Sequence, residues 1–305
     1  MKKTSLLRQL INSPKILVTP GAYDCLSAKL IESMGFKSLA TTGAGIANSF
    51  LGLPDVGILG LSDNLSVTRN ITQAVDIPVT ADADTGYGNA VNVYHTVKLF
   101  EQTGVAGINL EDQVFPKRCG HLKGKEIVSM EEMAKKIKAA VYARKDPDFI
   151  INARTDAAAI YGIDEAIKRA NAYIEAGADM VFPDAVLSEE DISKFVSQVS
   201  APVSINMGLI IRQRPTTPLV SFKRLEELGV ARVTFPRMTT AAALAGMKKA
   251  FEVVLESIAR GKIIERDELV FSFQELTNLV GLSKILELEK NFLSEDMLKS
   301  KYGSS

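Results

Sequence analysis

Eight short β-rich runs recur along this chain of 305 residues, and stretches with a helical pattern separate them. The runs span residues 16–20, 38–43, 77–83, 107–112, 149–155, 180–185, 202–207 and 231–236. A glycine precedes some of them, as in the segments AGADM and LGVAR, where it is typical of a helix that ends just before a strand. Eight alternating units predict an α/β fold of the (β/α)8 barrel type, with a doubly wound sheet as the main alternative.

Residues 262–305 follow the eighth unit, and their apolar residues recur with a helical period. We therefore expect a catalytic barrel over residues 1–261 and a C-terminal helical tail over residues 262–305. From the residues alone, the tail is as well explained by an ordinary packed helix as by an exchange between subunits.

The charge of the chain is balanced, with 36 basic and 36 acidic residues, so no overall positive field favours nucleic acid or an anionic membrane. Cys25 and Cys119 offer no disulfide framework, and the apolar run near the N-terminus is too short for the core of a signal peptide. No apolar run approaches the length of a membrane span. We expect a cytoplasmic protein whose partners are small molecules and copies of itself, with no nucleic acid and no membrane.

Polar residues end five successive runs, at the place where barrel enzymes carry their reacting groups. They are Asp82 and Asp84, Glu111 and Asp112, Arg154 and Asp156, Asp184, and Asn206. A helix cap explains one or two such positions, and we expect that role for Asp156. Five polar strand ends in succession predict an active site.

Asp82 and Asp84 are two residues apart on a predicted strand, so both side chains leave the same face. Oxygen ligands with room for water and substrate favour Mg2+ or Mn2+ over zinc. A pair of helix caps or a salt-bridged turn is the alternative.

The loop from residue 117 to residue 121 places Cys119 among Lys117, Arg118 and His121. Neighbouring positive charge stabilises a thiolate, so we expect a lowered pKa for this thiol. The alternative is a packed cysteine in a solvated basic loop.

The sequence KRCGH followed by a Gly-Lys pair resembles the signature loop of the isocitrate lyase and phosphoenolpyruvate mutase superfamily. The similarity runs from PGAYDCLSAKL through DADTGYGNA, LEDQVFPKRCGH and NARTDA to the final helical segment. Within the superfamily the chain is similar to methylisocitrate lyases and to carboxyphosphonoenolpyruvate phosphonomutases, which also carry the cysteine.

The resemblance implies a Mg2+ ion held by Asp82 and Asp84, with Glu111 acting through water. It also implies a turn after the second strand that binds the substrate carboxylate through backbone N–H groups, and a tail that reaches a neighbouring subunit in a homotetramer. Asp55 matches a position near the metal, with a helix cap as its alternative. The expected catalytic residues are Cys119, Lys117, His121, Arg154 and Asp184, and the expected substrate-binding residues are Thr42, Gly43, Ala44, Asp55, Gly120 and Asn206.

Several positions depart from the methylisocitrate lyase pattern. Asp184 replaces a glutamate, which moves the carboxylate by about 1.5 Å. Ala40 replaces a tyrosine implicated in proton transfer, so the general base is unassigned. The other departures are Ala241 in place of an arginine, with Arg237 nearby, and the segment after Asn206, which brings in Arg212 and Arg214. The cradle for a pyruvate-like unit is retained, while the second half of the substrate meets a different surface.

We therefore expect a Mg2+-dependent lyase that cleaves a C–C bond of a small 2-hydroxy di- or tricarboxylate, similar to methylisocitrate or dimethylmalate, to give pyruvate or a close 2-oxo acid. Cys119 would protonate the carbanion, and Arg154, His121 and Asn206 would hold the carboxylates. The alternative for Arg154 is a structural ion pair with Asp184 or Glu111. The alternatives are a carboxyphosphonoenolpyruvate phosphonomutase, a decarboxylase or hydrolase of oxaloacetate, and a binding protein with a decayed site.

Overall fold

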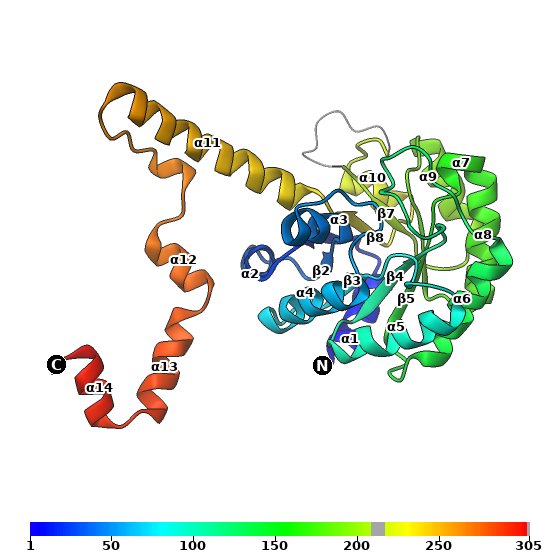
Figure 1. Ribbon diagram of the computed structural model, residues 1–305. Helices are drawn as coiled ribbons and strands as arrows, with labels where there is room; N and C mark the ends of the chain where they lie inside the picture. The colour runs from blue at the N-terminus through cyan, green and yellow to red at the C-terminus, as the bar shows by residue number, and fades with distance from the viewer. Residues whose placement is uncertain (209–216, 304–305) are drawn as a thin grey trace. The chain divides into compact units, whose positions relative to one another are not determined.

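A computed structural model describes residues 1–208 and 217–303 of the chain (Figure 1). Arg212 and Arg214 therefore lie outside the described residues. The strands are β1 (Leu17–Ala22), β2 (Leu39–Thr41), β3 (Val79–Asp82), β4 (Gly107–Glu111), β5 (Ile150–Thr155), β6 (Met180–Pro183), β7 (Ser204–Asn206) and β8 (Arg232–Phe235). Each lies inside one of the eight predicted runs or overlaps it closely.

The eight strands form one parallel sheet in the order β6-β5-β4-β3-β2-β1-β8-β7. A parallel bridge between Val181 of β6 and Val203, just before β7, joins the two ends of this order. The Val181 N–H also donates a hydrogen bond to the Pro202 carbonyl at 3.1 Å. Because a doubly wound sheet keeps two separate edges, this closure confirms the (β/α)8 barrel and excludes the alternative.

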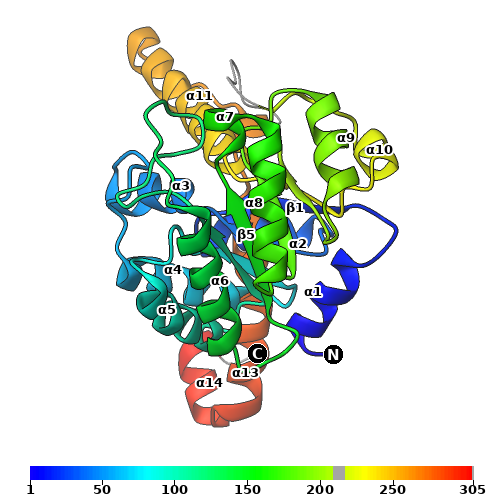
Figure 2. The ribbon, with the colours of Figure 1, turned by 90° about the vertical axis from the view of Figure 1, so that its right-hand side faces the viewer.

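Helices follow the strands and cover the outside of the barrel (Figures 1 and 2). In the first compact unit they are α1 (Lys3–Ile11), α2 (Cys25–Ser33), α3 (Gly43–Ile46), the π-helical turn η1 (Ala47–Leu51), α4 (Leu61–Ala74), α5 (Ala90–Gln102), α6 (Met130–Ala143), α7 (Ala158–Tyr161), α8 (Ile163–Glu175), α9 (Glu189–Gln198) and α10 (Phe222–Glu227). Side-chain caps start several of them. Asp24 accepts the Ser27 N–H at 2.7 Å before α2, and Asn89 accepts the Val91 N–H at 2.9 Å before α5.

Strand β4 shows how the alternation of a strand positions the site. Ile108 and Leu110 are buried in the hydrophobic core between strands and helices. Asn109, one position along, contacts Asn152 of β5 and Arg232 of β8 and so points into the barrel. Glu111 lies two residues beyond Asn109 on the same face, because side chains alternate along a strand. The inward face of β4 therefore carries Glu111 to the C-terminal mouth of the barrel.

Arg232 is fully buried in the barrel interior. Its guanidinium donates to three neutral oxygens, on Ser204 at 3.0 Å, Thr80 at 3.3 Å and Asn109 at 3.2 Å. Burial lowers the pKa of Arg232 to about 10. Arg232 and Ser204 are the first residues of β8 and β7, whereas Asn109 is the middle residue of β4 and lies level with Asp82.

The chain divides into two compact units, Met1–Ala242 and Ala243–Ser305. Helix α11 (Met238–Arg260) begins in the first unit and ends in the second, and is followed by the 3-10 turn η2 (Asp267–Leu269), α12 (Phe273–Leu279), α13 (Leu282–Phe292) and α14 (Glu295–Tyr302). The predicted helical tail is confirmed, and the predicted domain boundary at residues 261 and 262 stays a prediction. In the described part of the chain, no helix is long and apolar enough to cross a membrane.

Candidate active site

The C-terminal ends of the strands surround a cavity of about 50 Å³, room for about four water molecules or a small organic acid. Its lining residues are Thr42, Ala44, Asp55, Asp82, Lys117, Cys119, Gly120, His121, Arg154, Asp184, Asn206, Pro236 and Arg237. The structure thus brings together most of the residues that the sequence predicts for the site. Gly43, Asp84 and Glu111 do not line the cavity but contact residues that do.

The turn after β2 packs directly on the two aspartates at the end of β3, Asp82 within the strand and Asp84 just beyond it. The Gly43 N–H donates to Asp82 Oδ2 at 3.1 Å, and the Asp84 N–H donates to Asp82 Oδ1 at 3.2 Å. A Cβ atom at Gly43 would lie 2.9 Å from Asp82 Oδ2 and 3.3 Å from Asp84 Oδ1. Only glycine permits this approach, which brings one oxygen of each aspartate close to the same point.

The same turn offers fewer backbone N–H groups to a ligand than the sequence predicts. The Thr42 N–H donates to the Ala22 carbonyl at 3.1 Å, and the Gly45 N–H donates to the Thr42 hydroxyl at 3.1 Å. The Gly43 N–H is taken by Asp82. Of the amides from Thr42 to Gly45, that of Ala44 is therefore the one without a partner among the described residues.

Lys117 joins the loop of residues 117–121, here called the cysteine loop because it carries Cys119, to Asp55 and Asp84. Its ammonium lies 2.6 Å from Asp55 Oδ1 and 2.9 Å from Asp84 Oδ1. Burial lowers the pKa of Lys117, but Asp84, Glu111 and Asp55 outweigh it and hold this pKa well above the ordinary value. The side chain of Asp55 pairs with Lys117 instead of capping a helix, so the alternative role of Asp55 is wrong. Lys117 is a fixed positive charge in the site.

The acidic groups in this region are buried and incompletely paired. Burial, followed by the charges of Asp82 and Asp55, outweighs Lys117 and raises the pKa of Asp84 to about 6. Burial also raises the pKa of Glu111 well above its ordinary value. Asp84 Oδ1 contacts the Lys117 ammonium without hydrogen-bond geometry, and Glu111 Oε1 has no hydrogen-bond partner among the described residues. Asp84 also has a backbone φ of +47°, which is unusual for a residue with a side chain and is typical of functional sites.

The site contains more acidic than basic side chains. Six acidic residues, Asp55, Asp82, Asp84, Glu111, Asp156 and Asp184, lie around four basic ones, Lys117, Lys125, Arg154 and Arg237. Burial lowers the pKa of His121, which keeps this imidazole neutral near neutral pH. The acidic groups exceed the basic groups by two, so the charge balance fits a divalent cation. In the described residues no three His, Cys, Asp or Glu side chains are grouped as metal ligands, so such an ion would take other ligands from water or substrate.

Arg154 is held by three carboxylates. Its Nε and Nη2 atoms donate to the two oxygens of Asp156 at 2.9 and 3.0 Å, and Nη2 also donates to Asp184 Oδ2 at 2.9 Å. Nη1 lies 3.2 Å from Glu111 Oε2. The guanidinium fork is therefore occupied by Asp156, and a substrate-binding role of Arg154 stays a prediction. The alternative ion pairs with Asp184 and Glu111 are confirmed.

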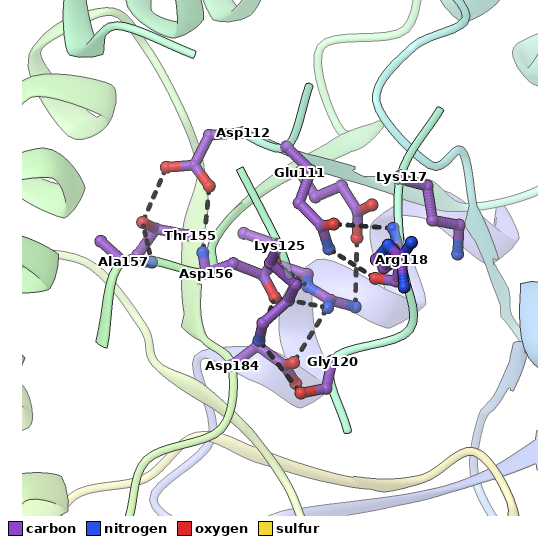
Figure 3. Close-up of polar contacts among 12 residues, drawn as sticks. Glu111, Asp112, Lys117, Arg118, Gly120, Lys125, Thr155, Asp156, Ala157 and Asp184 are labelled. Carbon is purple, nitrogen blue, oxygen red and sulfur yellow. Dashed lines mark hydrogen bonds and ion pairs between the residues drawn. The ribbon is translucent and has the colours of Figure 1, made fainter. Parts of the chain in front are cut away.

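Asp156 and Lys125 anchor the cysteine loop (Figure 3). Lys125 donates to Asp156 Oδ1 at 2.9 Å and to the Gly120 carbonyl at 3.0 Å. The prediction that Asp156 caps a helix is wrong, because its side chain is used by Arg154 and Lys125 and α7 begins without a side-chain cap. Lys125 ends the Gly-Lys pair of the signature loop, but the residues around it predict no role for its side chain.

Cys119 is buried, and its sulfur contacts a different cation from those expected. Arg237 Nη2 donates to Cys119 Sγ at 2.8 Å, whereas Lys117 pairs with aspartates and Arg118 is exposed. Burial raises the pKa of the Cys119 thiol and outweighs the opposing effect of Arg237. The predicted lowering of this pKa is therefore wrong. Local sequence does not reveal burial or a partner 118 residues away.

Comparison with known proteins shows the family of the chain. Residues 7–255 match the profile of the family described as phosphoenolpyruvate phosphomutase. The chain is 41% identical over 292 residues to 2,3-dimethylmalate lyase of Eubacterium barkeri, covering 96% of this chain and 99% of that protein. It is 41% identical over 276 residues to 2-methylisocitrate lyase of Aeropyrum pernix, covering 90% of this chain and 86% of that protein.

Solved structures of three related enzymes have the same fold. Oxaloacetate acetylhydrolase with 3,3-difluorooxalacetate has a TM-score of 0.87 and 33% sequence identity, and the match covers 95% of this chain and 97% of that one. For 2,3-dimethylmalate lyase the TM-score is 0.86 and the identity 33%, and the match covers 95% of each chain. For phosphonopyruvate hydrolase with oxalate and Mg2+ the TM-score is 0.85 and the identity 32%, and the match covers 96% of this chain and 100% of that one. From the family profile, the sequence identity and these structures, the chain belongs to the phosphoenolpyruvate phosphomutase family, within the PEP mutase/isocitrate lyase superfamily of enzymes.

Proposed function

We propose that this protein is a Mg2+-dependent lyase that cleaves a C–C bond of a small 2-hydroxy di- or tricarboxylate of the methylisocitrate or dimethylmalate type. The products are pyruvate, or a close 2-oxo acid, and a second carboxylic acid. The observation that carries the proposal is that the buried thiol of Cys119, whose pKa burial raises, and the side chain of Asp82 line one small cavity. Relatives named as 2,3-dimethylmalate lyase and 2-methylisocitrate lyase support it.

Asp82 and Asp84 would hold the Mg2+ ion, or Mn2+ in its place, and Glu111 would act through water. The excess of two acidic groups and the unpaired Glu111 Oε1 support this assignment, as does the related phosphonopyruvate hydrolase with oxalate and Mg2+. When bound, the ion supplies positive charge that stabilises negative charge on the oxygens of a 2-oxo acid.

The protein's own groups provide the proton and the orientation. A proton donor must carry its proton before the reaction, and burial keeps the Cys119 thiol in that form near neutral pH. The free Ala44 amide and the side chains of His121 and Asn206 line the cavity as partners for substrate carboxylates. Arg154 contributes mainly by fixing Asp184 and Glu111, because its fork is already occupied.

Hydrolysis of oxaloacetate is the second candidate function. The cavity of about 50 Å³ suits a short acid, and the related oxaloacetate acetylhydrolase superimposes with a TM-score of 0.87. Oxaloacetate lacks the extra carbon atoms of a methylisocitrate, so the two candidates differ in the size of the substrate that the site must accept.

A substrate screen separates these functions. The purified protein with Mg2+ is incubated with 2,3-dimethylmalate, 2-methylisocitrate, oxaloacetate and carboxyphosphonoenolpyruvate, and the products are identified by mass spectrometry. We expect a 2-oxo acid from one of the 2-hydroxy acids. Release of oxalate from oxaloacetate, with no turnover of the 2-hydroxy acids, would replace the lyase assignment with the hydrolase.

We also propose a homotetramer built from pairs that exchange their C-terminal tails. In support, none of the described side chains in α11, α12, α13 and α14 is buried within one chain, although Phe251, Phe273 and Phe292 are large and apolar. Such residues need a covering surface in water. The cytoplasmic location stays a prediction.

A further inference from the structure

Arg237 follows Pro236 directly after β8. Gly21 of β1 contacts the chain both before and after Arg237. A Cβ atom at Gly21 of β1 would lie 2.6 Å from Pro236 Cα, so β1 and this segment are in close contact. Two residues after Arg237, the Thr239 hydroxyl donates to the Gly21 carbonyl at 2.7 Å. The guanidinium of Arg237 therefore starts from a well-supported backbone position at the mouth of the barrel.

The charge of Arg237 differs from that of the other cations in the site. Lys117 and Arg154 are each paired with two or more carboxylates, and Lys125 is paired with Asp156. Among the described residues, no carboxylate lies within ion-pair distance of Arg237, whereas its Nη2 atom donates to Cys119 Sγ at 2.8 Å. Its positive charge is therefore directed at a sulfur atom instead of being neutralised by an acidic side chain.

We propose that Arg237 is a positioning residue for proton transfer, which orients the Cys119 sulfur and stabilises the thiolate that forms when the thiol gives up its proton. A buried thiolate is costly unless a hydrogen bond or a positive charge compensates it. Arg237 supplies both in one contact, because its guanidinium carries a positive charge and N–H donors. The inference rests on the proposed function for the acceptor of the proton.

The step balances in atoms and charge. The S–H bond of Cys119 breaks, its electron pair stays on sulfur, and the proton forms a C–H bond with the carbanion of the departing acid. Arg237 then donates to a thiolate instead of a thiol, which is a stronger, charge-assisted hydrogen bond. After the product leaves, solvent returns a proton to the sulfur.

The first test measures the thiol itself, without any substrate. In a Cys25→Ala background Cys119 is the remaining cysteine, and its alkylation by iodoacetamide across pH, followed by mass spectrometry, gives its apparent pKa. Arg237→Met should raise that pKa by about one unit or more, so that alkylation slows about 10-fold at a pH below it. Arg237→Lys should restore most of the effect. An unchanged pKa in folded Arg237→Met would overturn the proposal, and Arg237→Gln repeats the test if the methionine variant does not fold.

Arg118→Met is the matched control. It removes the same charge by the same substitution from an exposed residue adjacent to Cys119 in sequence, so the pKa of the thiol should stay within about 0.3 units of the unsubstituted value. An equal shift in both variants would mean that general charge, and not the contact with sulfur, sets the pKa. The specific role of Arg237 would then be wrong.

The second test uses turnover. With an active substrate, Arg237→Met should lower kcat about 10-fold or more and change KM about 3-fold or less, because the interaction acts in the transition state. A raised KM with unchanged kcat and unchanged thiol pKa would show that Arg237 binds substrate instead, and would overturn the inference. If no 2-hydroxy acid is cleaved while the pKa shift appears, the lyase assignment fails and the role of Arg237 toward the thiol stands.

Discussion

Gly120 and Asp184 approach so closely that a single methyl group cannot fit between them. A Cβ atom at Gly120 would stand 1.8 Å from Asp184 Oδ2 and 3.1 Å from Arg154 Nη2. The cysteine loop therefore rests directly on the carboxylate that pairs with Arg154. The position of Cys119 over the cavity depends on this contact.

Gly120→Ala should displace the loop while leaving the barrel folded. We expect kcat/KM to fall by about 100-fold, because a misplacement of about 1 Å in an active site has a cost of that order. The measurement combines steady-state kinetics with circular dichroism. Gly246→Ala is the control, since a Cβ there meets no atom within 4 Å, and it should leave activity unchanged. Equal activity in the two variants would show that the loop tolerates the displacement.

Asp82→Asn should weaken the binding of Mg2+. In the unsubstituted protein, added Mg2+ should raise the unfolding temperature, because a ligand that binds only the folded state stabilises it. The variant should show little or no rise, whereas Asp76→Asn, at an exposed position, should behave like the unsubstituted protein. Chelation should abolish turnover, and Mg2+ or Mn2+ should restore it. Full activity in excess chelator would refute the metal assignment.

Cys119→Ser should lower kcat by about 10²–10⁴-fold, the usual cost of losing a general acid. Binding of oxalate, measured by calorimetry in the presence of Mg2+, should survive because Asp82 and the Thr42 turn are unchanged. The raised pKa of the thiol also predicts that its alkylation accelerates mainly above the ~8.5 of a free cysteine. Turnover of the serine variant within a few-fold of the unsubstituted enzyme would assign the proton to another group.

The raised pKa of Asp84 predicts a pH dependence of stability in the metal-free protein. A carboxyl whose folded pKa, about 6, exceeds its ordinary 3.8 favours the folded state below that lower value, and this contribution is lost as the pH rises through 6. The loss is at most about 3 kcal/mol. Urea unfolding between pH 4 and 7 should show a steeper decline than in Asp84→Asn. If the free energy of unfolding depended on pH in the same way in both proteins, the raised pKa of Asp84 would be contradicted.

The assembly predicts a definite mass in solution. Light scattering of the full chain at micromolar concentration should give about four times the 33.1 kDa of one chain. Phe273→Glu, at an exposed apolar position of α12, should shift this mass downward, whereas Lys284→Glu, on an exposed charged residue of α13, should not. A monomer with the tail intact would contradict the exchange.

The sequence predicts the barrel well because each strand carries its own local signal. The runs 107–112 and 149–155, for example, correspond to β4 and β5 almost residue for residue. The placement of the site follows from the same signal, since parallel strands bring their C-terminal ends to one mouth.

The pairing of charges could not be predicted in this way. Whether Arg154 grips a substrate or three carboxylates depends on which strand ends are neighbours and on side-chain geometry at the ångström scale. The pKa of Cys119 depends on burial and on Arg237, which lies far away in the chain. Neither quantity has a local pattern in the residues around the motif.

The tip of β4 carries two adjacent carboxylates that serve opposite sides of the barrel wall. Glu111 pairs with Arg154 inside, while Asp112 accepts the hydroxyl of Tyr173 at 2.8 Å and the Arg169 guanidinium at 3.2 Å, both from α8 outside. One peptide unit joins the two residues, so we expect a change in α8 that displaces Asp112 to displace Glu111 as well. A substitution at Tyr173, which lies on the outer helix, is therefore expected to affect catalysis through the position of Glu111 and not through contact with substrate.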